Sequence, residues 1–124
     1  MEIIISNSNK KPIYDQIESQ IKDMIMIGTL KEGDALPSMR LLAKELRISV
    51  ITTKRAYEEL ERDGFIETVT GRGSFVARKN LELIKEEQLR RAEEYLLESV
   101  DVAKSSGITL EELVDILSAL YEEG

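Results

Sequence analysis

Residues 36–65 read LPSMRLLAKELRISVITTKRAYEELERDGF, and this stretch predicts two short helices joined by a tight turn. Pro37 cannot lie inside a helix, so the first helix begins directly after it, with Ser38 placed to cap its free backbone N–H groups. Ser49 is placed to cap the second helix, which Gly64 ends.

Each of these helices has one apolar face. In the first helix the face is formed by Leu41, Leu42 and Leu46. In the second helix the spacing i, i+3, i+4, i+7 defines one buried stripe, formed by Thr53, Ala56, Tyr57 and Leu60. Two short amphipathic helices in this order predict a helix-turn-helix.

The first two turns of the second helix carry the side chains that can contact phosphates or base edges. They are Ser49, Val50, Thr52, Lys54 and Arg55. A helix-turn-helix places this part of its second helix in the major groove of DNA, so the pattern indicates a DNA reader.

Two β-prone runs follow the helices, at residues 65–69 and 74–77, around Thr70-Gly71-Arg72-Gly73. The two glycines allow the positive φ angles of a tight hairpin, which leaves Arg72 at its tip. By itself such a hairpin is more often only a solvated turn. Its position after two helices instead favours the wing of a winged helix-turn-helix. Residues 34–36 are expected to add a small third strand beside it.

The ordered motifs along residues 10–78 resemble the GntR family. They are PIYDQI at 12–17, GTLKEGDALPS at 28–38, RLLA at 40–43, TTKRAYEEL at 52–60 and GRGSFV at 71–76. GntR proteins are bacterial transcription regulators, usually repressors, that bind palindromic operators as dimers. The short C-terminal part resembles the YtrA subfamily, in which about two helices used for dimerisation replace a larger effector-binding domain.

Position by position, this resemblance implies a set of DNA-binding residues. The predicted set is Ser38, Arg40, Ser49, Val50, Thr52, Thr53, Lys54, Gly71, Arg72 and Gly73. Position 50 departs from the commonest family pattern, which has an Arg there that contacts a guanine. Val50 can touch a thymine methyl, but it cannot make the bidentate contact to guanine.

The net charge of −7 is divided unevenly along the chain. Residues 1–79 carry 13 Lys and Arg against 12 Asp and Glu, whereas residues 80–124 carry 4 against 12. Because local charge governs DNA binding more than the total does, the acidic balance of the C-terminal part is compatible with a DNA-binding N-terminal part.

The C-terminal part predicts a helical hairpin. Apolar residues at 89, 92, 96, 100 and 103 form one seam, Ser105-Ser106-Gly107 interrupts it, and Thr109 with Glu112 forms a capping box for a last helix. The hairpin can pack against the winged domain or against a second copy, and we favour the second copy. The predicted dimerisation residues are Leu89, Ala92, Leu96, Val100, Leu113, Leu117 and Leu120.

Several classes of function are disfavoured. The chain has neither Cys nor His, so the usual zinc ligands and an imidazole base are absent, and no motif indicates a cofactor or a small-molecule effector. The adjacent acidic pairs, such as Glu58-Glu59, point about 100° apart on a helix and do not converge as catalytic pairs. Because no catalytic arrangement is recognisable, we expect a non-enzymatic protein. Neither a signal peptide nor a membrane span is recognisable, so we expect it in the bacterial cytoplasm.

The sequence therefore predicts a mainly α fold with a small β-hairpin wing: a winged helix-turn-helix at 1–79 and a dimerisation hairpin at 80–124. We expect a homodimeric repressor that binds an inverted repeat, with transporter genes as targets by family analogy. The alternative is a winged helix that serves as a protein-interaction module. A fragment of a larger, aminotransferase-like family member is disfavoured, because no catalytic lysine environment is present.

Overall fold

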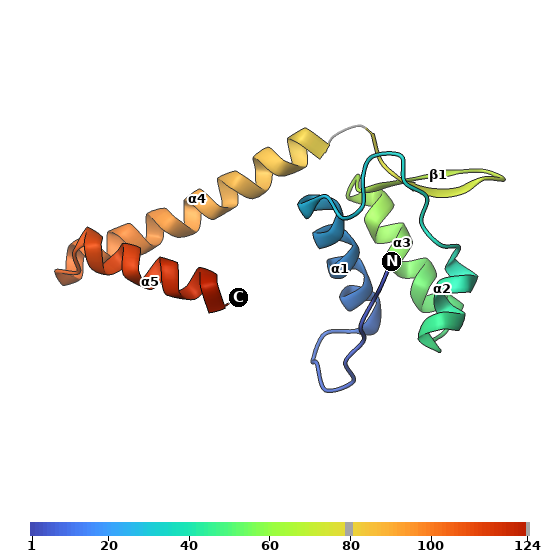
Figure 1. Cartoon of the computed structure of the whole chain (residues 1–124), viewed down its shortest axis with the longest axis horizontal. Coiled ribbons are helices and arrows are strands. Elements are labelled where there is room, and N and C mark those ends of the chain that lie inside the picture. The colour runs from blue at the N-terminus through green and yellow to red at the C-terminus, as the bar shows by residue number, and fades with distance from the viewer. Residues whose placement is uncertain (79–80, 124) are drawn as a thin grey trace. The chain divides into compact units, whose positions relative to one another are not determined.

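The computed structural model describes residues 1–78 and 81–123 and confirms the predicted fold class. In chain order its elements are α1 (Ile13–Ile27), α2 (Met39–Leu46), α3 (Val50–Arg62), β1 (Ile66–Val69), β2 (Gly73–Val76), α4 (Leu81–Ser106) and α5 (Leu110–Glu123), as Figure 1 shows. The chain forms two compact units, Met1–Ile84 and Lys85–Gly124. The predicted boundary between residues 79 and 80 lies outside the described residues.

The core of the first unit is built where α1, α2 and α3 meet. It contains Ile17, Ile21 and Ile25 from α1, Leu42 from α2, and Ala56, Tyr57 and Leu60 from α3, with Ile66 and Val76 from the wing. α1 and α3 run parallel, because Tyr14 contacts Arg55 and Lys22 contacts Asp63, each pair being 41 residues apart. Their N-terminal ends therefore lie at the same end of the unit.

The N-terminal segment lies across this core. Ile3 is buried, while the backbone of Ile4 and Ser6 is held by side-chain amides of α1. The N–H of Ile4 donates to Oε1 of Gln20 at 2.9 Å, and that of Ser6 donates to Oε1 of Gln16 at 2.9 Å. The buried Gln16 is thus a structural residue, which replaces the hydrogen bonds that a neighbouring strand would supply.

The turn between α2 and α3 is fixed by two caps and one left-handed residue. The Oγ of Ser38 accepts from the N–H of Leu41, and the Oγ of Ser49 accepts from that of Ile51, both at 3.1 Å, which confirms both predicted caps. Arg47 has φ 57, so the chain reverses without a glycine.

The wing is an antiparallel pair in which Ile66 faces Val76 and Val69 faces Gly73. The expected third strand is present as a single bridge, Ala35 to Phe75. The N–H of Leu36 donates to the carbonyl of Ser74 at 2.9 Å, and this bond joins the wing to the segment that leads into α2.

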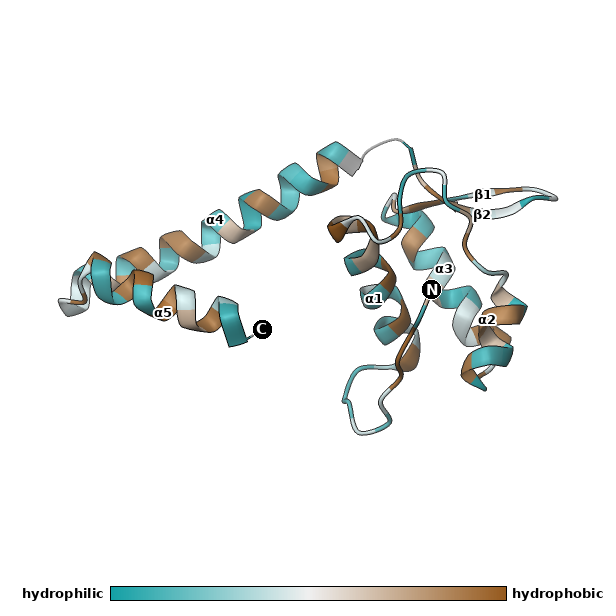
Figure 2. Ribbon diagram, viewed as in Figure 1, coloured by the Kyte–Doolittle hydropathy of each residue, from teal (hydrophilic) through white to brown (hydrophobic). Residues whose placement is uncertain are grey.

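The second unit contains the predicted helical hairpin. Thr109 and Glu112 form the predicted capping box, with Oε1 of Glu112 accepting from the N–H of Thr109 at 3.2 Å and Oγ1 of Thr109 accepting from the N–H of Glu112 at 3.1 Å. α4 extends to Ser106, so the interruption lies at Gly107, with φ 73. Hydrophobic bands recur along α4 in Figure 2. In the described ranges, 1–78 and 81–123, no helix is long and apolar enough to cross a membrane.

Tyr57 provides a test of how α3 is attached. Its hydroxyl donates to the carbonyl of Pro37 at 2.7 Å, and burial, followed by the nearby Glu45 carboxylate, raises the pKa of Tyr57 above its ordinary value. Tyr57→Phe removes this donor, so we expect the free energy of unfolding at pH 7 to fall by about 1 kcal/mol, measured by urea denaturation.

The raised pKa also predicts a pH dependence. The folded state keeps the Tyr57 proton above about pH 10, where the unfolded state loses it, so the contribution to stability is present below pH 10 and declines above it. The difference in stability between wild type and Tyr57→Phe should therefore shrink from pH 9 to pH 11. A difference that stays constant over this range would contradict the assignment.

Candidate nucleic-acid interface

The predicted reading residues lie at the N-terminal end of α3, outside its buried stripe. Ser49, Val50 and Lys54 are exposed and Thr52 is half-buried. Nζ of Lys54 lies 3.9 Å from Oε1 of Glu58, in a pair whose side chains are both more than 60% exposed. So exposed an ion pair contributes little, which leaves the Lys54 ammonium free to turn toward another anion.

The structure removes Thr53 from the predicted DNA-binding set. Its side chain is fully buried, and its Oγ1 donates within the unit, 2.9 Å from the carbonyl of Met39 and 3.0 Å from that of Val50. The periodicity that places Thr53 in the buried stripe is confirmed. The prediction that Thr53 contacts DNA is wrong, because a side chain on this face of α3 cannot also reach solvent.

The two capping serines keep some capacity for a ligand. Ser38 and Ser49 each accept a backbone N–H, but a hydroxyl that accepts one bond still has its own proton to donate. Arg40, in the first turn of α2, is exposed. These positions place three hydrogen-bond donors at the N-terminal ends of α2 and α3.

The wing residues lie at the hairpin turn. Arg72 is exposed, and its backbone N–H donates to the carbonyl of Val69 at 2.9 Å, which closes the turn. Gly71 has φ 79 and Gly73 has φ 111, conformations that L side chains rarely adopt. Both glycines are therefore required by the turn, and Arg72 carries its charge.

Arg55 is held differently from the other members of the predicted cluster. Its guanidinium carbon lies 3.9 Å from the centre of the Tyr14 ring, and its Nη2 donates to the Tyr14 hydroxyl at 3.2 Å. Sequence reasoning missed this pairing because Tyr14 is on another helix, 41 residues away. Stacking fixes the guanidinium at the edge of the reading face while its other N–H groups remain available.

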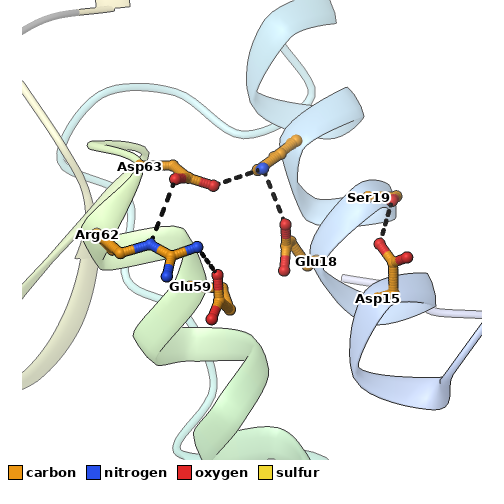
Figure 3. Close-up of polar contacts among 7 residues, drawn as sticks. Asp15, Glu18, Ser19, Glu59, Arg62 and Asp63 are labelled. Atoms are coloured by element: carbon orange, nitrogen blue, oxygen red, sulfur yellow. Dashed lines mark hydrogen bonds and ion pairs between the residues drawn. The ribbon is translucent and has the colours of Figure 1, made fainter.

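Around the last turn of α3, charged groups pair with one another. Nζ of Lys22 lies 2.9 Å from Oε1 of Glu18 and 2.8 Å from Oδ2 of Asp63, and Arg62 pairs with Glu59 and Asp63 (Figure 3). Partial burial acts to lower the pKa of Lys22, but the bonds to Asp63 and Glu18 outweigh it and raise that pKa. These charged side chains therefore pair with one another within the first unit.

First-turn charges distinguish the two helices of the helix-turn-helix from the rest. α1, α4 and α5 have acidic residues in their first turns: Asp15, Glu82, Glu111 and Glu112. The first turns of α2 and α3, both fully described, contain no acidic residue. The positive ends of these two helix dipoles are therefore not neutralised by their own side chains, which favours phosphate nearby.

Most of the predicted dimerisation residues line one apolar groove of the second unit, between α4 and α5. They are Leu96, Val100, Leu113, Leu117 and Leu120, and the groove also involves Leu110, Val114 and Ile116. Leu89 and Ala92 are exposed and lie earlier on α4, outside the groove.

Within the described residues no group of three or more carboxylates is placed to hold a metal ion.

The helix-turn-helix, its basic hairpin and the exposed face of α3 define a winged helix-turn-helix protein. The family model described as "Bacterial regulatory proteins, gntR family" matches residues 13–76. The chain therefore belongs to the GntR family of bacterial regulatory proteins.

Two kinds of known protein are similar to the chain over most of its length. It is 37% identical to the HTH-type transcriptional repressor YtrA of Bacillus subtilis, over 90% of this chain and 85% of that protein. A solved GntR family transcriptional regulator from Listeria monocytogenes has a TM-score of 0.70 and 31% identity, covering 93% of this chain and 98% of that one.

A third similarity is to a protein solved together with DNA. AraR(DBD) in complex with operator ORX1 has a TM-score of 0.55 and 25% identity, covering 62% of this chain and 96% of that one. The winged unit is therefore also similar to a domain whose structure was solved in complex with an operator.

Because Thr53 is buried and Thr52 is half-buried, substitutions of these adjacent threonines should differ in their effect on stability. Thr53→Val keeps the shape but leaves the Met39 carbonyl without its donor, so the free energy of unfolding should fall by about 1–3 kcal/mol. Thr52→Val, on the half-exposed side, should change it by less than about 0.5 kcal/mol. Urea denaturation of both variants measures this, and equal losses would contradict the assigned orientation of α3.

Proposed function

We propose that this GntR-family regulator represses transcription in the bacterial cytoplasm by binding, as a homodimer, an inverted-repeat operator in double-stranded DNA. The observation that carries the proposal is the exposed first turn of α3, which is free of acidic residues and continues into Lys54. In this proposal residues 1–79 form the DNA-binding domain and residues 80–124 the dimerisation region. Genes for transporters are the proposed targets, by analogy with the YtrA subfamily alone.

DNA contact is supported by exposed basic side chains on three different elements of the winged unit. Lys54 is on the reading face of α3, Arg40 is in the first turn of α2, and Arg72 is at the tip of the wing. We assign base contacts to the region of Thr52 and Lys54, a phosphate contact to Arg40, and a minor-groove contact to Arg72. The similarity to AraR(DBD), solved with its operator, supports this use of the winged unit.

Dimerisation is supported by the apolar surface of the second unit. Leu117 is 48% exposed, Leu96 47% and Leu120 61%, although all three line one groove. A helical hairpin with so much uncovered apolar surface gains stability by burying it against an equivalent hairpin. Closed two-fold dimers are the commonest solution, and they match the symmetry of an inverted repeat.

A random duplex library supplies a probe for the DNA-binding part of the proposal. We expect the wild type to enrich an inverted repeat whose half-sites lie about 10 base pairs apart. On the enriched duplex Lys54→Ala should lose about 1–3 kcal/mol of binding free energy, with a smaller loss on a scrambled duplex. Fluorescence anisotropy over a salt series measures both.

Arg62→Ala is the matched control, because Arg62 is another basic residue of α3 but is paired with Glu59 at the far end of the helix. Its affinity should stay close to that of the wild type. Arg40→Ala should weaken binding to both duplexes alike and reduce the salt slope by about one unit. A library that enriches no sequence would refute the DNA-binding role and favour a protein-interaction module.

Light scattering tests the dimer. The wild type should have twice the chain mass of 14.1 kDa, and Leu96→Glu or Leu117→Glu should lower it toward one chain, since an unpaired charge in an apolar interface costs several kcal/mol. Val102→Glu is the control, because Val102 is exposed on α4 but does not line the groove. A wild type that is monomeric at micromolar concentration and still binds the enriched duplex tightly would contradict the assembly.

A further inference from the structure

Two adjacent apolar side chains begin the reading helix. Val50 is the first residue of α3 and is 43% exposed, and Ile51 is the second and is 79% exposed. Single exposed apolar residues are common on protein surfaces and need no explanation. The location of this pair distinguishes it, because it occupies the part of the helix that the proposed function inserts into the major groove.

The pair is not explained by the stability of the helix. Val and Ile are β-branched and have low helix propensity, and the first turn favours acidic residues that interact with the helix dipole. Ser49 already caps the helix through the N–H of Ile51, a bond that any residue except proline at position 51 would permit. At 79% exposure the Ile51 side chain also buries little apolar surface within the chain.

The neighbours of the pair belong to the interface. Lys54 is four residues after Val50 and three after Ile51, so its side chain adjoins both, although Val50 and Ile51 themselves point about 100° apart. An ammonium beside two apolar groups matches the chemistry of the major groove, where phosphates and base acceptors lie close to thymine methyl groups. An unrelated apolar protein partner would leave Lys54 without a matching anion.

Resting on the proposed function, we infer that Val50 and Ile51 contact thymine C5-methyl groups, so that each half-site is recognised in part by methyl groups. Position 50 lacks a guanidinium, and the bidentate contact to guanine that such a group allows is therefore not available there. The half-site should contain at least one thymine opposite the first turn of α3. The contribution of that thymine methyl group to the binding free energy should increase with the apolar area of the side chain at position 51.

Deoxyuridine in place of thymidine removes only the methyl group and keeps base pairing and the O4 acceptor. The probe is the duplex that the wild type enriches from the random library, synthesised with one thymine at a time replaced by uracil. For a thymine in contact with Ile51 we expect about fourfold weaker binding, which corresponds to about 0.8 kcal/mol for one buried methyl-sized group.

Ile51→Thr supplies the second arm of a double-mutant cycle. Ile51 is too exposed for this change to disturb the core, so the variant should fold normally, bind the thymine duplex more weakly, and lose most of its sensitivity to uracil at that position. Ile27→Thr is the matched control, because Ile27 is 77% exposed and lies at the C-terminal end of α1. It should keep both the affinity and the fourfold effect of uracil.

Two results would overturn the inference while leaving the proposed function intact. One is a wild type that binds every single-uracil duplex within about 1.5-fold of the thymine duplex. The other is an Ile51→Thr variant with the full wild-type sensitivity to uracil, because the effect would then come from DNA shape. Failure of the library to enrich any sequence would refute the proposed function itself, and this inference with it.

Discussion

Burial of one stripe of α3 fixes the rotation of that helix about its own axis, and the rest of the interface depends on this constraint. Ala56 and Leu60 are fully buried, and Tyr57 is 1% exposed. Turning the helix by one residue would rotate its side chains by about 100° and would bring charged groups into the core. Hydrogen bonds from Thr53 to Met39 and from Tyr57 to Pro37 add directional restraint to apolar packing. What α3 displays to solvent is thus determined by what it buries.

The parallel packing of α1 on α3 gives the two ends of α3 different chemistry. Toward its N-terminal end, Arg55 is stacked on Tyr14 and keeps free donors. At its C-terminal end, Lys22 pairs with both Glu18 and Asp63, so those charges are neutralised locally. An anion therefore meets the remaining donors of Arg55 and an open helix dipole at the N-terminal end of α3, whereas the charges at the other end are paired. The packing of α1 on α3 thus determines which end of α3 can bind a polyanion.

Local features of this fold were predictable from sequence, and long-range ones were not. The caps at Ser38 and Ser49 and the capping box at Thr109 depend on residues within one helical turn, so residue type and spacing suffice. The Tyr14–Arg55 stack joins two helices, and the left-handed Arg47 replaces the glycine usual in such a turn. The family resemblance places Thr53 among the DNA-binding residues, whereas its periodicity places it in the core. Periodicity was the better guide, because burial is decided by the whole helix face.

A reading helix that begins with Val50 and Ile51 has a quantitative consequence for the proposed assembly. One bidentate Arg–guanine contact discriminates by about 1–3 kcal/mol, whereas a buried methyl-sized group contributes about 0.8 kcal/mol. Half-sites recognised by methyl groups therefore bind more weakly one at a time. Joining two such units makes the second contact intramolecular, so the affinity of the pair can exceed that of either unit by 10²–10⁴. In the proposed dimer, the apolar groove between α4 and α5 and the apolar start of α3 would be complementary parts of one mechanism: weak binding by each unit would become tight when two units are held together.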